Sequence, residues 1–175
     1  MSKPEFVYTI YIKAPTEKIW QALTDSATSA QYWGGSQVRS DWKVGSTVDI
    51  VDPAGRVATT GKVIEFDAPR RLSYSWHVVF HEVFSCEGHS KVTFELEPLG
   101  EATKLTITHD GFEPGSLVLE STSEGWPMLL SDLKSVLETG SPATPAPKPG
   151  DPDPYEAAIE WGLEERKKSI ADERR

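Results

Sequence analysis

Residues 123–138 carry a broad apolar stripe at helical spacing, and this stripe constrains the fold more than any other feature of the chain. Counted from residue 126, apolar side chains recur at i, i+4, i+7 and i+11, which is one face of an α-helix. The stripe consists of Trp126, Leu129, Leu130, Leu133, Val136 and Leu137. Because this helix follows a long run of strand-like segments, we expect it to bury its apolar face against a sheet.

The segments that precede this helix alternate between apolar and polar side chains, which predicts strands. We expect strands at 6–13, 37–40, 46–51, 56–66, 72–79, 91–96 and 104–109. The apolar face of the last three is formed by Leu72, Tyr74, Trp76, Val78, Val92, Phe94, Leu96, Leu105, Ile107 and His109. The other face is polar, as in an antiparallel sheet that is covered on one side.

Two short helices are predicted between the first two strands. The first begins at Pro15 and Thr16, and the second is capped by Asp25 or Ser26. For the long helix, Ser121 and Glu124 have the spacing of a capping box. We expect Pro127 to kink or break it, because proline lacks the amide N–H of a helix interior.

The chain divides into three predicted parts. Residues 1–140 form the main domain, and residues 141–154 form a proline-rich, semi-rigid linker. Residues 155–175 have the composition of a further helix, on which Trp161 suggests docking onto this domain or a second subunit. A monomer and a homodimer are both left open.

The composition excludes some classes of binding partner and indicates the cellular compartment. A net charge of −9 and an isoelectric point near 4.9, with no basic stripe, argue against binding of nucleic acid or of an anionic membrane surface. No apolar run is long enough to cross a bilayer, and no export signal is evident. The single cysteine, Cys86, fits a reducing compartment. We therefore expect a soluble cytoplasmic protein.

Several motifs together resemble one family. They are Ile12-x-Ala14-Pro15, Ile19-Trp20-x-Ala22-Leu23-Thr24-Asp25, Gly61-x-Val63-x-Glu65, Pro69-Arg70-Arg71-Leu72-x-Tyr74-x-Trp76, Leu105-Thr106-Ile107-Thr108-His109-Asp110-Gly111-Phe112 and Gly125-Trp126-x-x-x-Leu130-x-x-Leu133-Lys134. In order and spacing, residues 5–140 resemble the family named after the activator of heat-shock protein 90 ATPase. That family belongs to the START-like superfamily, whose helix-grip fold is shared with the birch-pollen allergens.

This resemblance implies an α+β helix-grip fold, in which a curved antiparallel sheet wraps around the long C-terminal helix of the domain. It also implies a cavity between sheet and helix. The final helix is then an extension outside the family pattern. No fixed chemistry is implied, because the fold hosts ligand binders, cyclases, transfer proteins and co-chaperone domains.

The predicted ligand site is the apolar space between the sheet and the long helix. Its expected lining is Trp33, Glu65, Trp76, Phe94, His109, Trp126, Leu130 and Leu133. Glu65 faces inward if Val63 does, and is an ordinary surface charge if Ile64 and Phe66 point inward instead. The alternative for the whole lining is that these side chains fill the space completely.

The loop between residues 79 and 91 groups four residues that suit zinc: His81, Glu82, Cys86 and His89. Their spacing matches no compact zinc signature, so we expect an ordinary polar loop, no bound metal and no cofactor. The sequence also lacks a nucleophile elbow and a phosphate-binding glycine loop.

Three functions remain. The leading hypothesis is non-enzymatic binding of a small hydrophobic or aromatic ligand between the sheet and the long helix. The alternative is a stress-related, co-chaperone-like module whose partner is a chaperone or another protein. The third is a cyclase- or hydrolase-type enzyme in which His109 and Glu65 transfer protons.

Overall fold

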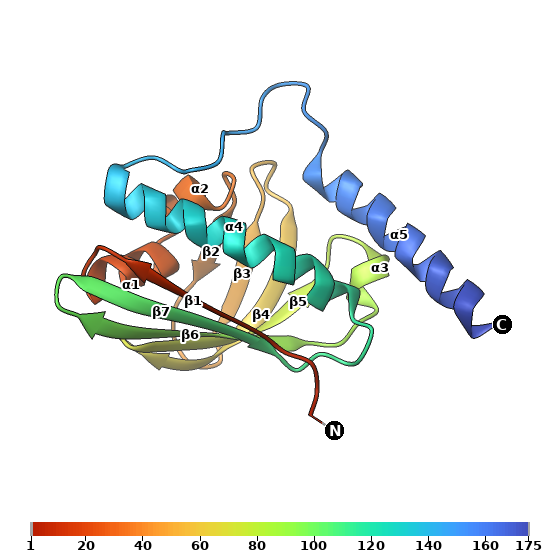
Figure 1. The fold of residues 1–175 in the computed structure, drawn as a ribbon, viewed down its shortest axis with the longest axis horizontal. Helices are drawn as coiled ribbons and strands as arrows, with labels where there is room; N and C mark the ends of the chain where they lie inside the picture. The colour runs from red at the N-terminus through yellow and green to blue at the C-terminus, as the bar shows by residue number, and fades with distance from the viewer. Residues whose placement is uncertain (1, 175) are drawn as a thin grey trace.

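The computed structural model describes residues 2–174 and contains one seven-stranded, entirely antiparallel sheet with the order β1-β7-β6-β5-β4-β3-β2. Its strands are β1 (Phe6–Ile12), β2 (Gln37–Ser40), β3 (Thr47–Val51), β4 (Val57–Asp67), β5 (Arg71–Val78), β6 (Ser90–Leu99) and β7 (Ala102–Asp110). The curved sheet lies under one long helix (Figure 1), so the α+β helix-grip prediction is confirmed.

The long helix, α4, spans Leu117–Thr139. Its predicted stripe faces the sheet, since Trp126, Leu130 and Leu133 are all buried. The predicted capping box is wrong, because the helix begins four residues before Ser121, where the Ser116 hydroxyl accepts a hydrogen bond from the Leu119 N–H. The helix also continues through Pro127 without a break.

Four further helices flank the sheet and α4. They are α1 (Thr16–Thr24), α2 (Ser26–Tyr32), α3 (Glu82–Ser85) and α5 (Pro154–Glu173). Asp25 caps α2 as predicted, because its carboxylate accepts from the Thr28 N–H. The linker runs back over α4 from its C-terminal end and brings α5 beside α3 (Figure 1). No helix among residues 2–174 combines the length and apolar character that crossing a membrane requires.

The predicted inner face of β5, β6 and β7 is confirmed, since all of its residues are buried. β4 departs from simple alternation. Val63 is buried, Ile64 is exposed, and the pairing of β4 with β5 shifts between Val63 and Glu65. This β-bulge inserts one extra residue, so Phe66 also turns inward and packs on Trp20.

Candidate functional site

Six rings, from β5, β6, β7, α4 and the end of α2, meet between the sheet and α4, and we call them the aromatic cluster. The cluster consists of Trp33, Tyr74, Trp76, Phe94, His109 and Trp126. Trp126 of α4 is at its centre, with ring centroids 5.4 Å from Trp76 and 5.7 Å from Trp33. Leu130 and Leu133, one and two turns further along α4, are fully buried in the same core. The structure thus brings seven of the eight predicted site residues into one core.

His109 is held by two hydrogen bonds that define its protonation. The Trp126 indole Nε1–H donates to His109 Nδ1 at 3.0 Å, so Nδ1 carries no proton. The proton is therefore on Nε2, which donates to the Ser90 hydroxyl at 2.8 Å. Burial lowers the pKa of His109 to about 3, so the imidazole is neutral at physiological pH. Both ring nitrogens are occupied by structural partners.

Trp76 contrasts with Trp126. It is 7% exposed, yet its indole Nε1–H has no hydrogen-bond partner within the described part of the chain. An unpaired donor in an apolar interior costs about 1–3 kcal/mol, which is why such donors are rare in folded proteins. Trp76 therefore presents an unused hydrogen-bond donor inside a cluster of neutral rings.

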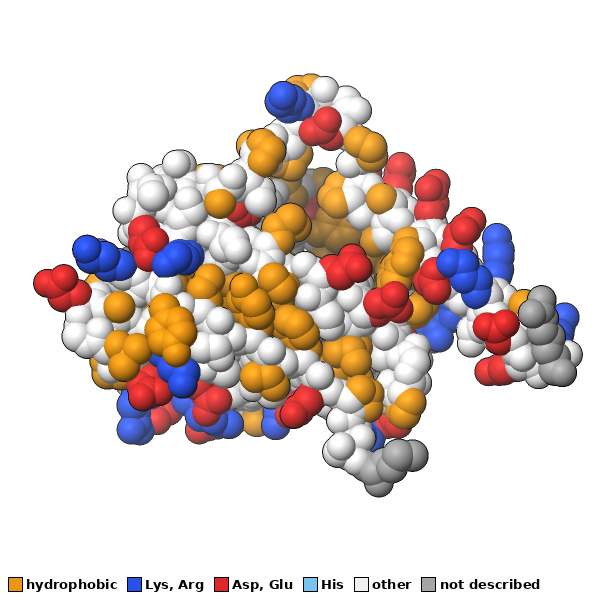
Figure 2. Space-filling model, viewed as in Figure 1, with side chains coloured by type: hydrophobic (Ala, Val, Ile, Leu, Met, Phe, Trp, Pro, Cys, Tyr) orange, Lys and Arg blue, Asp and Glu red, His pale blue; other side chains and the backbone are white. Residues whose placement is uncertain are grey.

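The cluster reaches the surface at Trp33. Trp33 is half-buried, and its backbone N–H caps the C-terminus of α2 by donating to the Ser29 carbonyl. Its ring lies 6.4 Å from that of Trp76 at an interplanar angle of 19°. Figure 2 shows a hollow framed by α4, the linker and α5, with hydrophobic side chains around it. Trp33 is thus the most exposed member of the aromatic cluster.

The structure places Glu65 away from the cluster. Because of the bulge in β4, its side chain lies on the outer face of the sheet, where it is 45% exposed and accepts a hydrogen bond from Arg71 Nε at 2.8 Å. Arg71 also pairs with Glu95. Glu65 and His109 therefore do not share a site, and a proton relay between them has no support in this geometry.

The loop between β5 and β6 does not gather its four candidate metal ligands. Among residues 2–174, no group of three or more His, Cys, Asp or Glu side chains is arranged to hold a metal ion. His81 instead caps α3 by accepting from the Val83 N–H, and His89 packs against His77 at 4.5 Å. The loop also contains α3, a short helix that the sequence analysis had treated as irregular.

Sequence reasoning missed two contributors. Ser90 completes the hydrogen bonding of His109 and lies just before the predicted strand at 91–96. Tyr155, in the first turn of α5, packs against Phe80 and lies under the Arg56 guanidinium, and these contacts join the C-terminal helix to the domain. Alternation could have placed Ser90, which is two residues before the inward-facing Val92, on the inner face.

Comparison with known proteins agrees with this geometry. Residues 13–138 match the model of the family described as "Activator of Hsp90 ATPase homolog 1-like protein". The match covers strands β2 to β7, all of α4 but its last residue, and every member of the aromatic cluster. The chain belongs to this family. The family assignment made from the sequence motifs is therefore confirmed, whereas a comparison with curated proteins finds no significant match.

Solved structures add detail. The protein MLL2253 from Mesorhizobium loti is 26% identical over 77% of this chain and 97% of its own, with a TM-score of 0.67. PFC0360w from Plasmodium falciparum, described as an Hsp90 activator, is 26% identical over 76% of this chain and 95% of its own, with a TM-score of 0.64.

CalU16 from Micromonospora echinospora is 18% identical and shares the fold over 93% of this chain and 86% of its own, with a TM-score of 0.63. That coverage of this chain exceeds the share occupied by residues 1–140. The likeness to CalU16 therefore takes in part of the C-terminal segment as well as the family domain.

Proposed function

We propose that this protein binds a small, neutral aromatic molecule between the sheet and α4, within the aromatic cluster. The observation that carries the proposal is the buried, unpaired indole N–H of Trp76. Such a donor is satisfied by a ligand that brings a hydrogen-bond acceptor, for example a carbonyl oxygen. Aromatic rings around the donor favour a flat, apolar ligand body, because offset and edge-on ring contacts add to the gain from burial.

The electrostatics of the cluster support a neutral ligand. Its rings carry no formal charge, and His109 stays neutral because burial lowers its pKa to about 3. An anionic ligand would lose its hydration without meeting a cation, which is costly in an apolar interior. Binding is favoured over acid–base catalysis, because both nitrogens of His109 are engaged by Trp126 and Ser90.

The test compares two probes of similar shape, 2-acetylnaphthalene and 2-isopropylnaphthalene, by isothermal titration calorimetry. Only the first has a carbonyl acceptor. Wild-type protein is expected to bind the ketone about tenfold more tightly, which is the ratio that one hydrogen bond to a buried donor contributes. Trp76→Phe removes the donor and keeps a ring, so the preference should fall to near unity.

Trp33→Phe is the matched control, since it makes the same substitution in the same cluster at a half-buried position. This variant should retain the preference for the ketone. Equal affinity of the wild type for the two probes, or absence of binding by either probe, would overturn the proposed function. Loss of the preference in Trp33→Phe but not in Trp76→Phe would show that the ligand accepts its hydrogen bond from Trp33, which contradicts the assignment of the donor to Trp76.

A second candidate rests on the family match and on the description of the Plasmodium falciparum structure as an Hsp90 activator. In this case the protein acts on a chaperone of the Hsp90 class. The discriminating measurement is the ATPase rate of such a chaperone with and without this protein. A stoichiometric, saturable increase supports the second function, and an unchanged rate removes it.

A further inference from the structure

The C-terminal segment, residues 141–174, docks on the domain through a narrow apolar contact. Trp161 stacks against Phe84 of α3 at 6.4 Å, and Gly162 is the only fully buried residue of α5. A Cβ on Gly162 would lie 3.1 Å from the Phe84 ring and 3.2 Å from Val83, so the helix approaches α3 as closely as its backbone allows. Most of α5 remains exposed to solvent.

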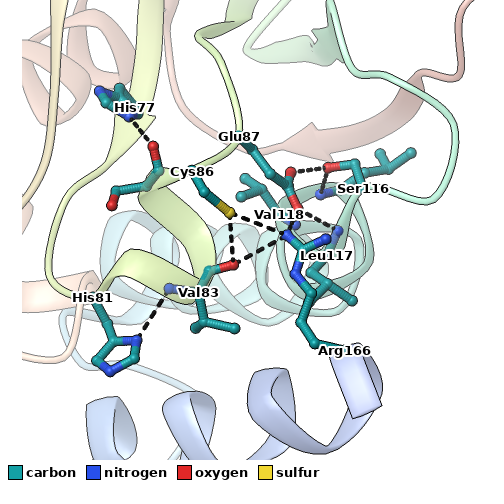
Figure 3. Close-up of polar contacts among 11 residues, drawn as sticks. His77, His81, Val83, Cys86, Glu87, Ser116, Leu117, Val118 and Arg166 are labelled. Carbon is teal, nitrogen blue, oxygen red and sulfur yellow. Dashed lines mark hydrogen bonds and ion pairs between the residues drawn. The ribbon is translucent and has the colours of Figure 1, made fainter. Parts of the chain in front are cut away.

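A polar contact joins α5 to the start of α4 (Figure 3). Arg166 Nη2 lies 3.0 Å from Glu87 Oε1 and donates to the Val83 carbonyl at 3.1 Å. The same Glu87 carboxylate accepts from the Leu117 N–H at 2.8 Å and from the Ser116 hydroxyl, and so holds the first turn of α4. One carboxylate thus connects the C-terminal helix to the helix that covers the aromatic cluster.

The first turn of α5 packs against Phe80 and against Arg56, which precedes β4. Tyr155 packs edge-on against Phe80 at 4.9 Å and carries the Arg56 guanidinium over its ring at 4.4 Å. Burial raises the pKa of Tyr155, and a hydrogen bond from Ser36 opposes that effect. Figure 2 shows α5 at the edge of the hollow that α4 and the linker also frame.

The linker contacts the domain near both of its ends, at Thr144 and at Asp153, whose carboxylate lies 3.8 Å from the Arg56 guanidinium. Thr144 is tied to α4, since its N–H and its hydroxyl both donate to the buried Asp132 carboxylate at 2.7 and 2.6 Å. Beyond Thr144 the chain is exposed, and it contains Gly150 with a φ of 97°. Movement of α5 therefore requires rearrangement only between residues 145 and 153.

From these contacts we propose that the C-terminal segment is a strap over the ligand site, latched by Arg166 on Glu87, and that a ligand enters and leaves only when α5 is undocked. This inference rests on the proposed function and adds its regulation. The latch is partly exposed to solvent and the apolar contact is small, so undocking is far easier than unfolding of the domain.

The experiment uses the full chain and measures the exchange of 2-acetylnaphthalene by stopped-flow quenching of tryptophan fluorescence. Gly162→Leu wedges α5 away from Val83 and Phe84, while leucine favours the helix itself. Arg166→Ala removes the latch alone. Lys167→Ala is the matched control, because Lys167 is exposed on the same turn of α5. Hydrogen exchange of the α5 amides reports undocking independently in each variant.

In Gly162→Leu we expect the association and dissociation rate constants each to rise about tenfold, with a smaller change in their ratio. In Arg166→Ala both rate constants should rise by about threefold, and in Lys167→Ala they should equal those of the wild type. Wild-type exchange rates in a variant whose α5 amides exchange freely would overturn the strap and leave the ligand site intact. Absence of binding in every form, the wild type included, would contradict the proposed function and the strap together.

Discussion

Two buried side chains in the aromatic cluster differ in one respect that decides the proposed chemistry. His109 is completely buried. Both of its ring nitrogens have hydrogen-bond partners, in Trp126 and Ser90. Trp76 packs edge-on against the same imidazole at 5.4 Å, but its N–H has no partner among the described residues. The histidine is therefore a structural group, and the indole of Trp76 is the group available to a ligand.

The neutral state of His109 gives a prediction about acid stability. An unfolded histidine titrates near 6.5, whereas burial lowers the pKa of folded His109 to about 3. Between these values the unfolded chain binds a proton that the folded chain does not. The free energy of unfolding should therefore fall as pH decreases from 6.5 toward 3, with this residue contributing at most about 1.4 kcal/mol per pH unit.

The comparison that isolates this contribution is His109→Gln, because glutamine can accept from Trp126 and donate to Ser90 without titrating. Urea unfolding at pH 7.0, 5.5 and 4.5, values chosen at roughly one-unit steps across the window, measures both proteins. The variant should lose less stability on acidification than the wild type. Parallel pH curves for the two proteins would show that His109 is not held neutral by burial.

At the scale of single elements, α4 shows which features of a helix its local sequence predicts and which it does not. Its stripe predicted which face is buried, because apolar periodicity reports burial directly. Its start was misassigned, because Ser121 and Glu124 imitate a capping box inside the helix. The true start depends on Ser116 and on Glu87, a carboxylate 30 residues away from the Leu117 N–H that it accepts from. Local patterns carry no information about such a partner.

β4 shows the same limit for strands. Alternation assigned the faces of β5 correctly through Tyr74 and Trp76, and it left Glu65 undecided. Neither alternative for β4 held, because the bulge after Val63 turns both Val63 and Phe66 inward and leaves Glu65 outside. An extra residue in one strand reverses the inward or outward direction of every later side chain. No residue type in this segment predicts the bulge.

Replacing glycine by alanine is expected to change the free energy of unfolding in opposite directions at two positions. A Cβ on Gly61 of β4 would lie 1.7 Å from the Ser75 carbonyl oxygen of β5, so Gly61→Ala should cost about 3 kcal/mol or more. Gly125 of α4 has nothing within 4 Å of its Cβ position, so Gly125→Ala should add about 0.5–1 kcal/mol through helix propensity. Urea unfolding of both variants is the measurement, and stabilisation by Gly61→Ala would contradict the close packing of β4 on β5.

Over the whole molecule, the parts predicted from sequence are those fixed by short-range periodicity and by the family motifs. They predicted the antiparallel sheet, the long helix and the C-terminal helix. The contacts that dock the C-terminal segment could not be predicted from the sequence, because Arg166 and Glu87 are 79 residues apart and neither belongs to a motif. Trp161 suggested docking, but only the fold identifies Phe84 as its neighbour in the same chain.

The central claim is that a ligand enters the aromatic cluster and accepts a hydrogen bond from Trp76. Titration of the ¹⁵N-labelled protein with 2-acetylnaphthalene tests it directly through the indole N–H signals, with the signal of Trp76 assigned by its absence in Trp76→Phe. We predict that this proton moves downfield and becomes protected from solvent exchange, while the Trp126 proton, already bound to His109, changes little. A Trp76 signal that does not respond to saturating ketone would contradict the claim.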